Sequence, residues 1–282
     1  SREAALDAGL REHGFTPGRE IRLERRCHQN LAQARAIIDE FVRNRVDLIF
    51  VGTPEPAAAA RAATREIPIV CGSCGDPLVN GLAESLARPG GNFTGMASLS
   101  AELIGKRVEL LREAVPGLSR IAVLLNPANP GTPAVQRALE AATRATGIGF
   151  STATFRALGD FDAALDAVAA SGARAVLIQD DPYTFAARVR IGELVVRHRL
   201  AAVAGSPEFA DAGTLIAYGP SRDDLYRRAA GQIHKILKGA KPGELPIEQA
   251  DKYDFVINAR TARALGLALA PALRLRADRV VD

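Results

Sequence analysis

Short apolar runs rich in β-branched residues alternate along this chain with longer alanine-rich stretches, and this alternation limits the possible folds more than any other feature. Runs with the length of buried strands occupy residues 46–51, 67–71, 120–125, 174–179 and 201–204. Helical patterns follow at residues 55–66, 133–146 and 182–197. A nearly continuous apolar strand must be covered on both faces, so the pattern predicts an α/β protein with parallel sheets flanked by helices.

The length of the chain predicts two lobes, because 282 residues exceed the usual size of a single hydrophobic core. The strongest turn signal is Pro89-Gly90-Gly91 within residues 86–95. We therefore predict an N-terminal lobe of residues 1–97 and 216–251, and we expect its first strand to be absent. The C-terminal lobe takes residues 98–215 and 252–282. The polar connectors 207–212 and 241–252 are the expected second and third crossings.

Two helical stripes support this division. One consists of Ile104, Val108, Leu111 and Val115, and the helix is expected to stop at the Pro-Gly pair that follows. The other consists of Leu225, Ala229, Ile233 and Ile236. Ser221 and Asp224 have the spacing of a capping box in front of the second stripe. Both stripes are expected to face a core.

Charge and hydropathy exclude two classes of partner. The formal charge is +4, but acidic and basic residues are interleaved and form no long block of one sign, so we do not expect nucleic-acid binding. No apolar run approaches the roughly 18 residues of a membrane helix. The first residues do not resemble a signal peptide, so we expect that any export signal is not present in this chain.

Small polar residues follow several of the predicted strands. In open parallel sheets, ligands bind outside the carboxyl ends of the strands, where loops and helix N-termini converge. This rule selects Thr53, Asp76, Asn126, Asp181 and Ser206. Thr53, Asp76 and Asp181 also have the sequence context of plain helix caps, and that interpretation stays open beside ligand contact.

Two tyrosines just beyond predicted strand ends, Tyr183 and Tyr218, could supply flat walls for a ring, or they could pack at a rim with a hydrated hydroxyl. Asp181 and Glu208 are the candidate partners of a ligand ammonium, since a buried cation needs a counter-charge.

The cysteine pattern admits a redox interpretation that we consider secondary. Cys71 and Cys74 have the spacing of a redox pair, but Cys71 ends a buried strand and no helix starts directly after it. Small buried thiols are the favoured interpretation, with Cys74 also a candidate ligand contact. The remaining cysteine and the four histidines lack metal-site spacing, and no catalytic motif is present. We therefore expect a protein that binds no metal or cofactor and is not an enzyme.

Several longer segments resemble a known family. SLARPGGNFTG and KILKGAKPGELPIEQ are the most specific, and DLIFVGTPEPAAAA, ELIGKRVELLREAVPG and YGPSRDDLYRRAA agree with them. Together they are similar to ABC transporter substrate-binding proteins, a family that includes tryptophan/tyrosine-type receptors. The resemblance implies a type I periplasmic-binding fold: two Rossmann-like lobes, three interlobe crossings and hinge closure on a ligand.

The chain departs from the family pattern in two places. In the family, a strand and a Gly/Ser-rich loop normally precede the segment matching residues 5–14, and we expect both to be absent here. The stretch that contains Cys71 and Cys74 usually lacks cysteine.

These observations predict an extracytoplasmic, periplasmic or lipid-anchored, solute-binding receptor of an ABC importer. It would be a monomer that delivers its ligand to a membrane permease. The expected ligand is a small aromatic carboxylate, either an aromatic acid such as a hydroxycinnamate or benzoate or an aromatic amino acid, bound in the interlobe cleft. Strand-end amides near Thr53 and Asn126 would hold its carboxylate, and its ring would lie against Tyr183 or Tyr218. The alternatives are the effector-sensing domain of a transcription regulator and, less favoured, a redox enzyme.

Overall fold

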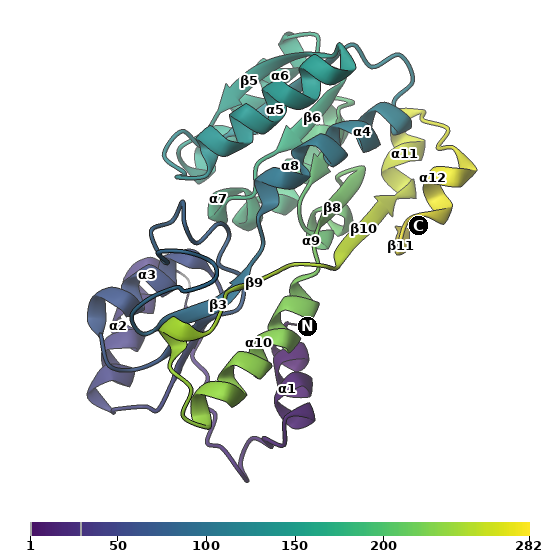
Figure 1. The fold of residues 1–282 in the computed structure, drawn as a ribbon. Helices are drawn as coiled ribbons and strands as arrows, with labels where there is room; N and C mark the ends of the chain where they lie inside the picture. Colours follow the sequence, from purple (N-terminus) through teal and green to yellow (C-terminus); the bar gives the residue numbers. More distant parts are fainter. Residues whose placement is uncertain (1, 29) are drawn as a thin grey trace. The chain divides into compact units, whose positions relative to one another are not determined.

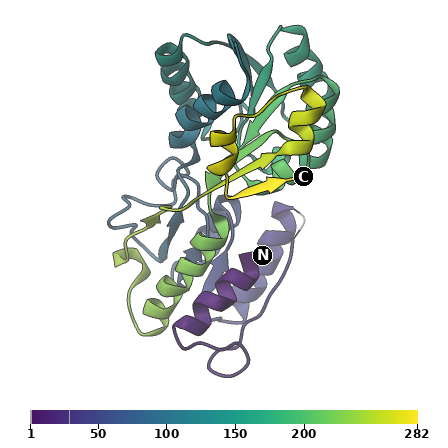
Figure 2. The same ribbon diagram turned by 90° about the vertical axis from the view of Figure 1, so that its right-hand side faces the viewer.

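The computed structural model describes residues 2–28 and 30–282, and the chain forms two compact α/β units (Figures 1 and 2). Unit 1 contains the chain up to Leu99 together with Ser221–Lys252. Unit 2 contains Ser100–Pro220 and Tyr253–Asp282. The chain therefore passes from one unit to the other three times, as the resemblance implied.

Unit 1 is built on four parallel strands in the order β1-β2-β3-β9. Their bounds are β1 Ile49–Val51, β2 Ile69–Cys71, β3 Phe93–Ala97 and β9 Glu248–Gln249. The helices are α1 Arg2–Glu12, α2 Leu31–Arg43, α3 Pro54–Ala63 and α10 Arg222–Leu237, with a short 3-10 helix η3 at Pro242–Glu244.

Two core clusters of unit 1 show how its sheet is covered. The helices α1 and α10 lie side by side in both views, and Leu10 packs there in one cluster with Met96 of β3 and Leu225 (Figures 1 and 2). The other cluster joins α2 and α3 to the sheet and includes Ile38 and Phe93. Apolar burial on both faces explains why the strands are nearly continuously hydrophobic.

Unit 2 has a seven-stranded sheet in the order β11-β10-β8-β7-β6-β4-β5. The bounds are β4 Arg120–Leu125, β5 Gly149–Thr154, β6 Ala175–Ile178, β7 Ala201–Ala204, β8 Ile216–Pro220, β10 Tyr253–Asn258 and β11 Arg279–Val281. Neighbours pair in parallel, with the exception that β10 runs antiparallel to β8. This exception places the amino end of β10 at the edge where β8 ends.

Helices cover both faces of the unit 2 sheet. One core cluster joins the sheet to α4 Ile104–Ala114, α5 Thr132–Thr146, α11 Ala259–Leu265 and α12 Pro271–Leu275. The other joins it to α6 Phe161–Ala170, α8 Arg188–Arg197 and α9 Pro207–Asp211. Three short helices, η1 Ser100–Leu103, η2 Leu158–Asp160 and α7 Pro182–Ala186, complete the unit.

Much of the predicted architecture is confirmed. The strands predicted at 120–125 and 201–204 have those bounds in the structure. Both predicted stripes are buried. No helix among the described residues is long and apolar enough to cross a bilayer.

Other expectations need correction. The helix predicted at 182–197 is two helices, because the first ends at the cap residue Ala187. The segment 207–212 is not a crossing, since it contains α9 of unit 2. Residues 216–220 were assigned to the first lobe, whereas they form β8, which pairs with β7 and β10 of unit 2. Ser221 occupies the N-cap of α10 without a side-chain cap bond, so no capping box forms.

Gly95 of the SLARPGGNFTG segment has a physical explanation in the sheet of unit 1. A Cβ at Gly95 would lie 2.3 Å from the carbonyl oxygen and 2.9 Å from the amide nitrogen of Cys71 on the neighbouring strand. We expect Gly95→Ala to lower the free energy of unfolding by about 2 kcal/mol or more, because backbone atoms of β2 must move. Denaturant unfolding measures this change in the free energy of unfolding.

Gly105→Ala is the matched control, because Gly105 lies in α4 and nothing lies within 4 Å of its added Cβ. This change should leave stability unchanged or raise it by about 0.5–1 kcal/mol. Equal stability of the Gly95 variant and the wild type would contradict the close approach of the two strands.

Candidate functional site

The carboxyl ends of four neighbouring strands of unit 2 carry polar residues. β4, β6, β7 and β8 lie side by side and run parallel, so their carboxyl ends emerge at one edge of the sheet. Asn126, Asp180, Asp181 and Ser206 follow β4, β6 and β7, whereas Tyr218 lies within β8, two residues before its end, and not beyond a strand end as predicted. We call this group the strand-end set. The structure thus brings four of the residues predicted from the sequence, Asn126, Asp181, Ser206 and Tyr218, to one edge.

Asp181 is a buried carboxylate, 7% exposed, that accepts three hydrogen bonds. Its Oδ2 accepts from the side-chain amides of Asn126 at 3.0 Å and Asn129 at 2.9 Å. Its Oδ1 accepts from the backbone N–H of Tyr183 at 2.8 Å, which confirms Asp181 as the N-cap of α7. All three donors are neutral, and within the described residues no cationic side chain lies at ion-pair distance from Asp181.

A second layer of buried polar groups fixes the turn between β4 and α5. Gln179, 2% exposed, accepts from the Asn126 N–H through Oε1 at 2.8 Å and donates to the Thr132 hydroxyl at 2.8 Å. The Thr132 hydroxyl donates to the Asn126 carbonyl at 2.5 Å. The sequence analysis missed these two residues and Asn129. A polar residue at the end of the apolar run 174–179 was the available signal for Gln179.

Ser206 differs from its neighbours because its hydroxyl is unsatisfied. The residue is 1% exposed, and Oγ has no hydrogen-bond partner among the described residues. It occupies the N-cap of the five-residue helix α9, yet its side chain makes no cap bond. A buried polar group left without a partner costs about 1–3 kcal/mol, so this hydroxyl requires an explanation.

Aromatic rings lie at the same edge of unit 2. The ring of Tyr218 stacks on that of Tyr253 of β10, with centroids 6.0 Å apart and an interplanar angle of 17°. Phe255 meets Tyr218 edge-on at 6.1 Å. Tyr183 on α7 is 43% exposed. Glu208 lies on α9, half-buried, and interacts electrostatically with Arg279.

Arg107 of α4 is a buried cation that contacts the strand-end set, and its side chain is 1% exposed. Its Nε donates to the Tyr218 carbonyl at 2.8 Å. Its Nη2 donates to the Ser100 hydroxyl at 2.7 Å and to Oδ2 of Asp180 at 3.0 Å. The sequence analysis missed Arg107, although a charged residue three positions after Ile104 falls on the apolar face of that helix.

The strand ends of unit 1 are organised separately. Thr53 is exposed at the N-cap position of α3 and makes no side-chain cap bond. Asp76 is not a helix cap: its Oδ1 accepts from the N–H groups of Leu78 at 3.0 Å and Val79 at 3.2 Å, which closes a turn. The chain places these two predicted residues in unit 1 with Cys74, and the other six in unit 2.

Tyr226 of α10 is a residue of unit 1 that the sequence analysis missed. A Cβ at Gly52 would lie 2.3 Å from its hydroxyl, and a Cβ at Gly72 would lie 2.9 Å from its ring. The phenol therefore reaches the ends of both β1 and β2. Burial raises its pKa, so the hydroxyl stays protonated at neutral pH.

The cysteine pair lies in the core of unit 1. Cys71 and Cys74 are free thiols, and both are 0% exposed. The Cys74 thiol donates to the Cys71 carbonyl at 3.6 Å. Burial, followed by its interaction with Cys71, raises the pKa of Cys74 well above its usual value. A thiolate is the reactive form, so this environment disfavours thiol chemistry.

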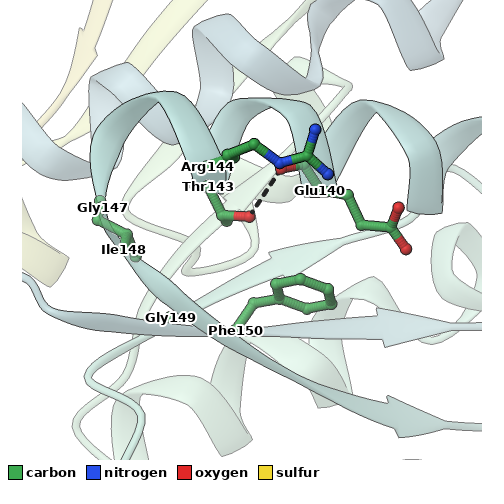
Figure 3. A pocket seen from close by; sticks show the side chains of 7 residues that line it. All are labelled: Glu140, Thr143, Arg144, Gly147, Ile148, Gly149 and Phe150. Carbon is green, nitrogen blue, oxygen red and sulfur yellow. Dashed lines mark hydrogen bonds between the residues drawn. The ribbon is translucent and has the colours of Figure 1, made fainter.

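The described residues contain no group of three or more potential metal ligands. Unit 2 does contain a shallow surface depression between α5 and the edge strand β5 (Figure 3). Its lining residues are Glu140, Thr143, Arg144, Gly147, Ile148, Gly149 and Phe150. The depression lies at the amino end of β5, so it does not include any residue of the strand-end set.

In open parallel α/β sheets, the residues after the carboxyl ends of the strands are where ligands commonly bind. A model of the family described as "ABC transporter substrate binding protein" matches residues 3–281, and the chain therefore belongs to this family. The family resemblance is thereby confirmed.

Similar proteins agree with this assignment. The chain is 23% identical over 266 residues to a "Tyrosine-binding protein" of Clostridioides difficile (strain R20291), covering 92% of this chain and 74% of the relative. Among solved structures, a conserved domain protein of Vibrio cholerae is similar with a TM-score of 0.90 and 26% identity. An ABC domain of Streptococcus pneumonia in complex with L-Trp is similar with a TM-score of 0.90 and 19% identity. Each alignment covers 99% of this chain and 94% of the solved one.

The fold is thus that of type I periplasmic-binding proteins, as predicted. The family consists of substrate-binding proteins, which agrees with the expectation of a binding protein rather than an enzyme.

The thiols provide a direct test of the redox interpretation. At pH 8 we expect one of the three cysteines, the exposed Cys27, to react with a thiol reagent in the native protein. The raised pKa of Cys74 keeps it protonated at this pH, and burial blocks access to Cys71. All three should react after denaturation, and Cys27→Ser should abolish the native reaction. Native modification of Cys74 would contradict this arrangement.

Proposed function

We propose that this protein is the extracytoplasmic receptor of an ABC importer, and that the strand-end set of unit 2 binds a small aromatic ligand. One observation supports the site most strongly: the Ser206 hydroxyl is buried at the strand-end edge without a partner. Such a group is explained if a ligand supplies the missing hydrogen bond. The proposed ligand therefore carries an oxygen or nitrogen that reaches Ser206.

The charge of the site favours an aromatic amino acid over a deamino aromatic acid. Asp181 is a buried carboxylate with neutral hydrogen-bond donors, and the ammonium of an amino acid would supply its counter-charge. The exposed ring of Tyr183 and the stacked pair of Tyr218 and Tyr253 are available for contact with a ligand ring. The similarity to a tyrosine-binding protein and to a domain solved with L-Trp supports the same ligand class.

Several finer expectations belong to this proposal. Asn126 would orient the ligand near Asp181, while Glu208 is the second candidate for the ammonium. Contacts of Thr53, Cys74 and Asp76 with the ligand stay predictions, as do delivery to a membrane permease, a monomeric state and a periplasmic or lipid-anchored location. Membership in a family of transporter-associated binding proteins supports the receptor over the sensing domain of a transcription regulator.

A thermal-shift screen with matched pairs of compounds tests the ligand class. L-tyrosine is compared with 3-(4-hydroxyphenyl)propionate, and L-tryptophan with indole-3-propionate, so that each pair differs by the ammonium group. A ligand at about 100 times its Kd adds about 2.7 kcal/mol of stability, which raises Tm by several degrees. We expect a shift with the amino acids and little or none with the deamino acids. The reverse order would refute the role of Asp181, and the absence of any shift would refute an aromatic ligand.

Replacing Ser206 separates a ligand contact from a structural role. Ser206→Ala should weaken binding of the preferred amino acid by about tenfold, which corresponds to one hydrogen bond. Stability without ligand should stay equal or rise, because the variant removes an unsatisfied buried hydroxyl. Calorimetric titration and denaturant unfolding measure the two quantities. Ser151→Ala, on the edge strand β5, is the control. A loss of stability with unchanged affinity would assign Ser206 to the fold alone.

A further inference from the structure

The proposed ligand site does not by itself explain the burial and the contacts of Arg107 in unit 2. Its side chain is 1% exposed, although arginine is rarely buried to this extent. A buried guanidinium is tolerated when its charge is paired and its N–H groups are hydrogen-bonded. Arg107 meets both conditions through the Asp180 carboxylate, the Ser100 hydroxyl and the Tyr218 carbonyl.

The three partners of Arg107 come from three separate parts of unit 2. Asp180 follows β6 and belongs to the strand-end set. Ser100 is the first residue of unit 2 after the chain arrives from unit 1. Tyr218 lies in β8, two residues before Pro220, where the chain leaves unit 2. The Arg107 side chain therefore bonds to the end of β6, to the segment where the chain enters unit 2 and to the segment where it leaves.

Additional contacts make this cluster a closed arrangement. The Ser100 hydroxyl also donates to Oδ2 of Asp180, so the carboxylate, the hydroxyl and the guanidinium are mutually bonded. The backbones of Gly205 and Gly219 are in close contact, because a Cβ at Gly219 would lie 1.8 Å from the Gly205 carbonyl oxygen. A Cβ at Gly205 would lie 2.2 Å from the Asp180 carboxylate and 2.4 Å from the guanidinium.

Gly205 immediately precedes Ser206, the residue with the unsatisfied hydroxyl. The position of that hydroxyl therefore depends on the Arg107–Asp180 pair, which packs directly against Gly205. The third chain passage is connected as well, since Tyr253, the first residue after it, stacks on Tyr218.

The first passage also contains backbone strain. Leu99, the last residue of unit 1 before Ser100, has a φ of +35°, a left-handed conformation that is unfavourable for a side chain of this size. Such a conformation persists where the flanking structure holds it. On the unit 2 side, the hydrogen bonds of Ser100 provide that restraint.

From this geometry we infer that Arg107 is a positioning residue of the strand-end set: it does not touch the ligand, and it fixes Asp180, Ser206 and the Tyr218 segment in the arrangement that binds. This inference rests on the proposed function of unit 2. Ordering groups during binding lowers affinity, so a site that Arg107 holds ready in advance binds more tightly than the same site without it.

A double-variant comparison separates positioning from simple stability. Arg107→Met leaves the Asp180 carboxylate without its cation, and Asp180→Asn leaves the buried guanidinium without its anion, so each single variant should have a lower Tm than the wild type. The double variant removes both charges, and its Tm should return toward the wild-type value. Its affinity should not return, because the three segments are no longer held together.

Affinity is measured by calorimetric titration with L-tyrosine and L-tryptophan, well below the Tm of each variant. We expect the double variant to bind about tenfold more weakly or worse. Arg107→Lys keeps the charge but cannot reach three partners at once, so it should bind with intermediate affinity. Arg112→Met, an exposed arginine on the same helix, should bind like the wild type.

Hydrogen exchange supplies a readout that needs no ligand. Exchange in the double variant should become faster in η1 and at the end of β8, while the amides of β4 and β6 keep their protection. Wild-type affinity in the double variant would overturn the inference about Arg107 and leave the proposed function intact. A wild-type protein that binds neither amino acid would overturn the proposed function, and the role of Arg107 in binding with it.

Discussion

The parallel pairing of β4, β6, β7 and β8 is the constraint on which the functional interpretation of unit 2 depends. Because these strands run in one direction, their last residues lie at the same edge of the sheet, and the helices that follow begin there. Apolar residues within the strands provide the stability, and the polar residues directly after them are left to hydrogen-bond with one another or with a ligand. Asp181 hydrogen-bonds with its neighbours, whereas the Ser206 hydroxyl has no partner among the described residues.

The carboxyl ends of the unit 2 strands carry both satisfied and unsatisfied buried polar groups. Asn126, Gln179 and Asp181 form a network in which each partner satisfies another, and such networks stiffen the loops that contain them. Ser206 lies on the next strand end with its hydroxyl unused. A rigid frame around an unsatisfied group is the arrangement expected for recognition of a small molecule, because little ordering remains to be done on binding.

The sequence predicted the elements that are formed by one continuous segment. The prediction failed where contacts with distant segments determine which unit or site a residue belongs to. The strands at 120–125 and 201–204 are uninterrupted apolar runs and were predicted with correct bounds. β5 was missed because its Ser and Thr residues at the sheet edge form no apolar run, and 216–220 was given to the other lobe because its pairing partners lie elsewhere in the chain. Among site residues, the polar residues after strands were visible, whereas Arg107 was not, since its partners come from three segments.

The interleaving of the two units has a consequence for how the protein acquires its structure. In unit 1, α1 packs along α10, and Arg227 donates to Glu12 at 2.9 Å across more than two hundred residues of sequence. All of unit 2 up to Pro220 lies in the chain between these helices. A folded unit 2 shortens that intervening loop and lowers the entropy lost when α1 meets α10. During synthesis α1 cannot pack against α10 until α10 has been made, so we expect unit 2 to fold before unit 1 is complete.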